Sequence, residues 1–246
     1  MAGRPPPSEI ELHEAIDWIN QQPDALTAIV KYKRPDLKGN LGYLHVGRLD
    51  DYGKFLQIQI HPPPTHEEKE IQIPLDPPIL SSFDLRPLFY KWRAEAFSLY
   101  RVPTNVQINY YERPAWFPFT APALIAMSVL FFSAWGTGHY ADLLREKIEF
   151  YLGPHMIKFG FGLLAFFHLA FEPAYMFWLT GKHKVPFGPR VKWILTNMAV
   201  GFGAINEFHE CVMYERLRLV YKQTDVGDIG PRNKGSEEVT AEKKKQ

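Results

Sequence analysis

The sequence predicts a membrane α-helical protein, with three transmembrane helices and one surface helix, that carries a small soluble α+β domain at its N-terminus. Two observations lead to this fold class. Residues 1–115 are rich in proline and charged residues, whereas residues 116–213 hold almost all the long apolar runs. Three of those runs reach the roughly 20 residues that a helix needs to cross a bilayer. The mean hydropathy of −0.22 averages these two unlike parts.

The soluble domain is expected over residues 8–105, after a flexible lead of residues 1–7. Ser8 and Glu11 have the spacing of a capping box, which predicts the start of a first helix. Pro23 then stands where proline is favoured, in the first turn of a second helix.

A sheet is expected in the middle of this domain. Apolar and polar residues alternate over residues 43–49 and 56–60, with turn residues at 50–53 between them. This pattern predicts a β-hairpin with one buried face. Residues 70–74 can add a third strand. Apolar residues then recur at helical spacing from about residue 83 to residue 99, which predicts a closing helix.

The soluble domain resembles a known module. The segment from Ile73 to Arg86 (IPLDPPILSSFDLR), followed by a helix ending in Arg93-Ala-Glu-Ala, is similar to the C-terminal half of domain of unknown function 2470. That module accompanies the split-barrel domain of haem-degrading and pyridoxamine-phosphate-oxidase-like proteins. The family's His-Met-Asn-x-Asp-His run is not present, because Gln21-Gln-Pro23 follows Asn20. The resemblance therefore implies the fold and not haem chemistry.

The membrane domain is expected over residues 116–222. Its predicted spans cover about residues 117–136, 156–179 and 191–213. Residues 140–151 are amphipathic and too charged to span, so they predict a helix that lies along the membrane surface.

A polar stripe runs through the second predicted span. His168 and Glu172 are four residues apart and share one helix face, with Lys158 close to the same stripe. Ionisable groups at membrane depth are costly, so they are expected to face a packed interior, a wet cavity or a ligand. Glu207 and Glu210 share a face near the end of the third predicted span.

Three roles are open for the His168–Glu172 pair. The two side chains could hydrogen-bond to each other and hold the helices together. They could instead bind a lipid headgroup or a small ligand. With Glu207 or Glu210 as a second carboxylate, they could also carry out acid–base chemistry. No residue is assigned a catalytic role from the sequence alone.

The membrane part resembles a second family. The segment from Leu163 to Tyr175 (LLAFFHLAFEPAY), followed by Lys182-His-Lys184, is similar to the three-helix family catalogued as transmembrane protein 254. The resemblance covers about residues 116–222. It maps the family's central histidine and glutamate onto His168 and Glu172, and its basic loop onto Lys182, His183 and Lys184. It implies an architecture but no activity.

Topology and location follow from tryptophan and basic residues. The candidates for the membrane interface are Trp116, Lys182, His183 and Lys184. Basic residues before the first span and after the second favour a cytosolic N-terminal domain. Residues 224–246 are expected to form a disordered tail. Its last segment, Lys243-Lys-Lys-Gln246, fits an endoplasmic-reticulum retrieval signal, which works from the cytosol. Three spans, however, put this tail in the lumen. Either the tail is only a basic end, or the span count or orientation differs. A mitochondrial membrane is the alternative location.

Composition narrows the remaining classes. A formal net charge of +1 argues against a general nucleic-acid binder. A single cysteine, Cys211, excludes an intrachain disulfide and a thiolate metal cage. We predict no metal site and no cofactor. The expected partners are the lipid bilayer and another membrane protein.

The sequence favours a non-enzymatic membrane subunit or scaffold. Its soluble domain would recruit a partner, and its helices would pack on another membrane protein or on lipid. The first alternative is a membrane enzyme of lipid metabolism that uses His168, Glu172 and Glu207. The second alternative is a haem-binding protein, although the histidine run of the first family is not present.

Overall fold

The computed structural model describes residues 9–50, 52–61, 69–76, 78–79, 82–114, 116–230 and 232. The chain divides into two compact units: residues up to 106 together with residues from 213 onward, here called the α+β unit, and residues 107–212, here called the helical unit. The predicted lead, the Ser8 cap and the end of the predicted tail lie outside the described residues.

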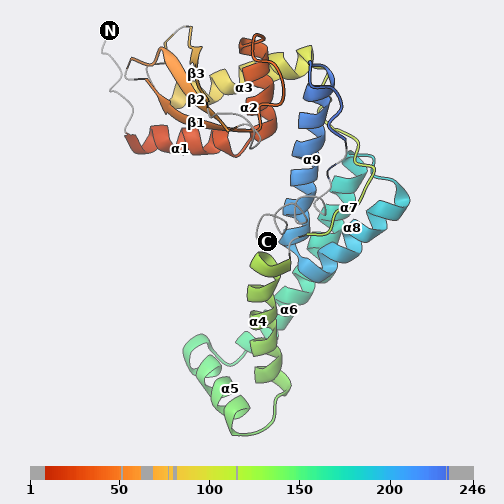
Figure 1. Cartoon of the computed structure of the whole chain (residues 1–246). Coiled ribbons are helices and arrows are strands. Elements are labelled where there is room, and N and C mark those ends of the chain that lie inside the picture. The colour runs from red at the N-terminus through yellow and green to blue at the C-terminus, as the bar shows by residue number, and fades with distance from the viewer. Residues whose placement is uncertain are drawn as a thin grey trace, which may run out of the picture. The chain divides into compact units, whose positions relative to one another are not determined.

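The α+β unit combines helices with one small sheet (Figure 1). Its elements are α1 (Glu9–Asn20), α2 (Pro23–Lys33), β1 (Tyr43–Leu49), β2 (Phe55–His61), β3 (Lys69–Pro74), α3 (Ser82–Leu99) and the last part of α9 (Phe202–Lys222). The strands form one antiparallel sheet in the order β1-β2-β3. The prediction of a largely helical chain with a small hairpin-based sheet is therefore confirmed.

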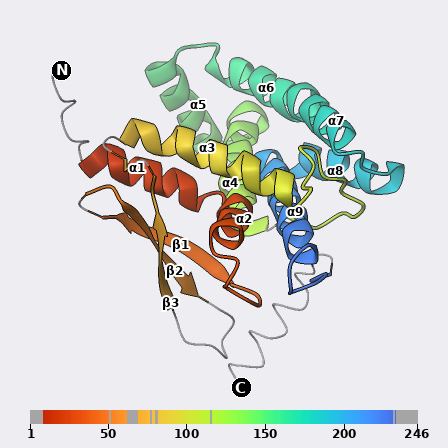
Figure 2. The ribbon, with the colours of Figure 1, turned by 90° about the horizontal axis from the view of Figure 1, so that it is seen from above.

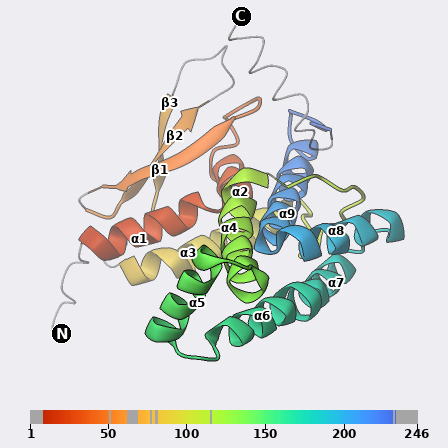
Figure 3. The same cartoon turned by 90° about the horizontal axis from the view of Figure 1, so that it is seen from below.

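One face of the sheet is buried, as the alternating pattern predicts. In β2 the buried residues are Leu56, Ile58 and Ile60. The helices α1 and α3 lie side by side, and α1 also packs on β1 (Figures 2 and 3). Asn20, the last residue of α1, pairs with the backbone of Val46 in β1 through two hydrogen bonds of 2.8 and 3.2 Å. The register of β1 against β2 shifts just after Val46.

The end of α9 belongs to the α+β unit, so the predicted membrane domain of residues 116–222 extends about ten residues too far. A buried ion pair helps to explain this grouping. Arg216 Nη1 lies 3.6 Å from Asp24 Oδ2, and Arg216 Nη2 donates to the carbonyl of Thr104 at 2.9 Å. Burial lowers the pKa of Arg216, and the Asp24 carboxylate partly offsets this effect. A long amphipathic stem lets arginine reach such a partner from a helix face.

The beginning of the predicted disordered tail is ordered. Residues 224–230 are held by the carboxylates of Asp225 and Asp228. Asp225 Oδ2 accepts a 2.6 Å hydrogen bond from the backbone N–H of Gly39. Asp228 pairs with Arg218 through two hydrogen bonds of 2.5 and 2.9 Å. Specific pairing therefore outweighs the low hydrophobicity of the segment.

The helical unit contains the apolar runs. Its elements are α4 (Trp116–Trp135), α5 (His139–Leu152), α6 (Met156–Phe166), the π-helix η1 (Phe167–Phe171), α7 (Glu172–Lys182), α8 (Phe187–Val200) and the first part of α9. The helices α7 and α8 lie side by side, and α4 packs on both α5 and α6 (Figure 1). The bounds of α5 closely match the amphipathic helix predicted over residues 140–151.

Membrane-length helices are fewer than predicted. Among the described residues, one continuous helical segment, Met156–Lys182, is both long and apolar enough to cross a membrane. In α4 the stretch Ile125–Trp135 is apolar but shorter than a membrane span. The third predicted span, residues 191–213, is not a single helix, because α8 ends at Val200 and α9 begins at Phe202. Gly201 between them has a φ of +67°, which ends the helix there.

Replacing Arg216 by leucine should lower the free energy of unfolding of the full chain by about 3–5 kcal/mol, because it leaves the buried Asp24 carboxylate without its counter-charge. Thermal unfolding in mild detergent measures the change. Asp36→Asn, which breaks the exposed pair with Arg34, is the control and should change the melting temperature little. The double variant Asp24→Asn/Arg216→Leu should recover much of the loss; if it is no more stable than Arg216→Leu alone, this interpretation is wrong.

Acid should release the segment around Asp228. The hydrogen bonds from Arg218 lower the pKa of Asp228 to about 2, below the ordinary value of about 3.9. The stabilisation is therefore complete above about pH 4 and is lost as the pH falls towards about 2. A carboxyl ¹³C NMR titration, assigned with Asp228→Asn, should give a midpoint near the lower value. Arg218→Ala should move the midpoint up, and an ordinary midpoint in the unmodified protein would contradict the pairing.

Candidate functional site

The predicted His168–Glu172 pair is in contact. His168 Nδ1 lies 3.4 Å from Glu172 Oε2, and the glutamate side chain is buried while the histidine is partly exposed. The contact joins two residues one turn apart, as their spacing predicts. The two side chains therefore meet within the helical unit, although Glu172 Oε2 accepts no hydrogen bond among the described residues.

The helix changes form where the pair sits. Phe167–Phe171 is a π-helical turn, and the backbone N–H of Glu172 donates to the carbonyl of Phe167, five residues earlier. Pro173 follows directly, and a proline cannot donate a backbone hydrogen bond or tolerate the carbonyl four residues before it. The wider turn admits the proline ring without breaking the helix. Such π-turns occur frequently at functional sites.

Gly201 packs against the pair from the corner between α8 and α9. A Cβ atom at this position would lie 3.0 Å from His168 Cε1 and 3.1 Å from Glu172 Oε2. The backbone there, with φ +67° and ψ −137°, is one that side chains other than glycine avoid. Both the space and the conformation therefore require glycine.

Asn197 completes this corner, and sequence reasoning did not single it out. The side-chain Nδ2 of Asn197 donates to the backbone carbonyl of Gly201 at 2.9 Å. The backbone carbonyl of Asn197 accepts the Gly201 N–H at 2.7 Å. Asn197 is fully buried. The available signal was an amide inside an apolar run, four residues before a glycine.

Two buried oxygens at this corner have no hydrogen-bond partner among the described residues: Glu172 Oε2 and Asn197 Oδ1. Buried acceptors of this kind are costly. A proton on Glu172, a bound water or a small donor would satisfy them. His168, Glu172, Asn197 and Gly201, here called the polar corner, can therefore hold a proton or a small hydrogen-bond donor.

A second cluster brings together Glu112, Glu207 and Cys211. Their ligand atoms lie within 4.8 Å of one another, all three residues are buried, and Cys211 Sγ donates to Glu112 Oε2 at 3.6 Å. Glu207 and Cys211 are one turn apart on α9. The sequence analysis grouped Glu207 with the His168–Glu172 pair and predicted no metal site, because it could not bring Glu112 to α9. Carboxylates and a thiolate are donors that Zn²⁺ accepts.

The segment that carries Glu112 is tied to the helices beside it. Trp193 Nε1 donates to the carbonyl of Tyr110 at 3.2 Å, and the hydroxyls of Tyr111 and Thr196 lie 2.8 Å apart. The N–H of Ile108 donates to the carbonyl of His183 at 3.2 Å. These bonds position Glu112 although no regular helix or strand contains it.

The other predicted residues have separate places. Lys158 and Glu210 are exposed, so Lys158 does not share the burial of Glu172. In the predicted basic loop, Lys182 and Lys184 are exposed, but His183 is buried and its ring centroid lies 5.5 Å from that of Phe208. The loop therefore turns its histidine inward, away from an interface role. Trp116 is the first residue of α4, and its side chain lies outside the described part.

Comparisons with protein-family models, with curated proteins and with solved structures found no match to this chain. The two family resemblances stay predictions, and the site must be interpreted from its own geometry.

Gly201→Ala should destabilise the helical unit by roughly 1–3 kcal/mol, the cost of holding a residue other than glycine in this backbone region, with the contact to His168 and Glu172 adding to it. The melting temperature in mild detergent measures this loss. Gly162→Ala is the matched control, because nothing lies within 4 Å of the added carbon there. If both variants melt together, Gly201 does not support the polar corner.

Proposed function

We propose that this chain is an integral membrane protein of the endoplasmic reticulum that acts as a non-enzymatic subunit. Its helical unit lies in the bilayer and packs on another membrane protein or on lipid. Its α+β unit lies in the cytosol and recruits a partner.

One observation carries the membrane placement. The segment Met156–Lys182 is 27 residues long, its most apolar stretch of 18 residues has a mean hydropathy of 1.3, and only 17% of that stretch is buried. At 1.5 Å per residue it measures about 40 Å, enough to cross the hydrocarbon core with some tilt. An apolar helix of a water-soluble protein would bury most of this surface. The exposed apolar surface of this segment is therefore more stable in the hydrocarbon of a bilayer than in water.

Neighbouring helices support the same placement. α4 is 20 residues long and contains no charged residue. Many large apolar side chains of the helical unit are exposed, among them Ile125, Phe131, Trp135, Phe159, Phe166, Leu169, Phe177, Trp178 and Leu195. Groups of exposed large apolar side chains on proteins mark contacts with a membrane or with another protein.

The α+β unit is made of two segments of the chain, one before and one after the helical unit, and this supports two spans rather than three. This unit contains residues from both ends of the chain, linked for example by Asp24 with Arg216 and by Gly39 with Asp225. Both ends must then lie on the same side of the membrane, which requires an even number of crossings between residues 107 and 212. α4 and the segment Met156–Lys182 supply two.

α8 and the start of α9 then form a re-entrant pair. α8 has 14 residues, about 21 Å, which is too short to cross. It runs along α7 towards the middle of the second span, where Gly201 meets His168 and Glu172, and α9 leads the chain out again. A broken helix is tolerated at membrane depth where protein buries it, and Asn197 bonds to the broken backbone.

This topology also removes the conflict over the tail. With two spans, the basic residues before α4 and those of the loop after α7 lie on one side, which the positive-inside rule makes the cytosol. The residues after 222 lie on that side too, so the conflict that three spans create does not arise.

The enzyme alternative is less well supported, because its three residues divide between two clusters. Among the described contacts, Glu172 meets His168 and Gly201, while Glu207 meets Glu112 and Cys211. Two separate buried polar clusters fit a role in holding helices together.

Cysteine labelling tests the topology. The only cysteine can be replaced (Cys211→Ser), and one new cysteine introduced by Gly153→Cys, before α6, or by Ser236→Cys, in the tail. In sealed microsomes, a membrane-impermeant maleimide should label the tail cysteine directly and the Gly153→Cys protein only after detergent is added. Ser98→Cys in the α+β unit is the cytosolic control. Protection of the tail cysteine would restore three spans, and extraction of the chain by alkaline carbonate would refute membrane insertion.

Purification tests the subunit role. In mild detergent, a second membrane protein should be retained at constant ratio. A protein that purifies alone and converts a lipid would contradict this role and favour the enzyme.

A further inference from the structure

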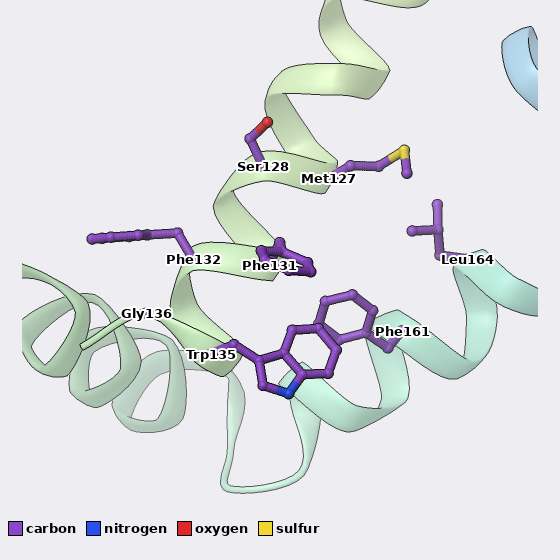
Figure 4. A pocket seen from close by; sticks show the side chains of 8 residues that line it. All are labelled: Met127, Ser128, Phe131, Phe132, Trp135, Gly136, Phe161 and Leu164. Atoms are coloured by element: carbon purple, nitrogen blue, oxygen red, sulfur yellow. The ribbon is translucent and has the colours of Figure 1, made fainter.

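Two cavities meet where α4, α5 and α6 pack together. The first, of about 440 Å³, is an apolar groove between α4 and α6 (Figure 4). Met127 and Phe131 face it from α4, and Phe161 and Leu164 face it from α6. The second, of about 410 Å³, lies between the end of α4, α5 and the start of α6. Trp135 and Phe161 line both cavities, with ring centroids 4.7 Å apart. The two spaces are therefore neighbours.

The second cavity carries charges of both signs. Arg145 and Glu149 line it from α5, and Lys158 lines it from α6. Arg145 is fixed in place, since it donates to the carbonyl of Ser133 at 3.0 Å, to the carbonyl of Gly136 at 3.3 Å and to Asp142 at 2.9 Å. Within the described part of the chain, neither Lys158 nor Glu149 has an ion pair. An ammonium and a carboxylate are thus available to a ligand.

The charged cavity and the apolar groove follow each other along α4, as headgroups and acyl chains do in a bilayer. The charged cavity lies at the end of α4 and the start of α6, beside the amphipathic helix α5. The apolar groove begins there and continues along α4 from Trp135 to Met127, a distance of about 12 Å at 1.5 Å per residue. Under the proposed membrane placement, the first position is headgroup depth and the second is acyl-chain depth.

We propose that these cavities form one binding site for an aminophospholipid. The phosphate would bind Lys158 and the remaining donors of Arg145, the amine would bind Glu149, and one acyl chain would fill the groove between Met127 and Leu164. The charge pattern selects this class, because a headgroup that carries both a phosphate and an amine complements two cations and a carboxylate. A lipid without phosphate or without amine would leave one of these groups unmatched.

This site rests on the proposed membrane placement and extends it. A lipid held here would join α4 to α6 through the groove and to α5 through the headgroup. α5 would then be part of a lipid-dependent structure rather than an independent surface helix.

Native mass spectrometry of the full chain in mild detergent, titrated with dioleoyl phosphatidylethanolamine, tests the headgroup site. Lys158→Gln should weaken retention of this lipid roughly tenfold, the effect of losing one hydrogen bond to a charged group. Lys147→Gln is the matched control, because Lys147 is equally exposed on α5 but does not line the cavity. Glu149→Gln should reduce the preference for this lipid over dioleoyl phosphatidic acid.

A second pair of variants tests the acyl groove. Ser128 and Ala126 are both exposed on α4, but only Ser128 lines the groove. Ser128→Trp should fill the groove and abolish tight retention of phosphatidylethanolamine, whereas Ala126→Trp should leave it intact.

Equal retention in Lys158→Gln and Lys147→Gln, or in Ser128→Trp and Ala126→Trp, would overturn the site and leave only general lipid contact. Equal retention of dioleoylglycerol, which lacks phosphate, would overturn it as well. Each variant is first extracted with alkaline carbonate. A variant that stays in the membrane but loses the lipid tests this site, whereas extraction of the unmodified chain refutes the membrane placement instead.

Discussion

The contact of Gly201 with His168 and Glu172 determines how the second half of the helical unit is arranged. Under the proposed membrane placement, the end of α8 at Val200 would expose backbone carbonyls and N–H groups to hydrocarbon, and each unpaired group would cost several kcal/mol. Here the side chain of Asn197 bonds to one of them, and the absence of a side chain at Gly201 lets the corner press on the polar pair. The π-turn before Pro173 places His168 and Glu172 beside Gly201. The turn at Gly201 and the π-turn η1 therefore stabilise each other.

The corner at Gly201 also matters for the proposed membrane topology. In the proposed two-span topology, the chain returns to the side of the membrane on which it began, because residues from 213 onward complete the α+β unit. A straight third helix would not allow this return, whereas a corner at Gly201 does.

Sequence periodicity predicted the secondary structure of the α+β unit well, since its sheet has one wet and one dry face and the alternation is direct. It failed where the outcome depends on distant partners. Residues 191–213 have the composition of a span, and only the packing of Gly201 on Glu172 explains why they bend. The order of residues 224–230 depends on partners such as Gly39 far away in sequence. Glu112 lies in an irregular segment without periodicity, so its meeting with Glu207 and Cys211 could not be anticipated.

Building one domain from both ends of the chain has a consequence for biosynthesis. Lys31 and Asp225, which lie 3.4 Å apart, are separated by 194 residues. At about 5–20 residues per second, a ribosome needs roughly 10–40 s to make that stretch. During this interval the nascent N-terminal segment is incomplete, and Asp24 has no arginine partner while the apolar helices of the helical unit are being synthesised. A chain that stalls within those helices leaves a domain with an uncompensated charge, which is the kind of defect that cellular quality control detects.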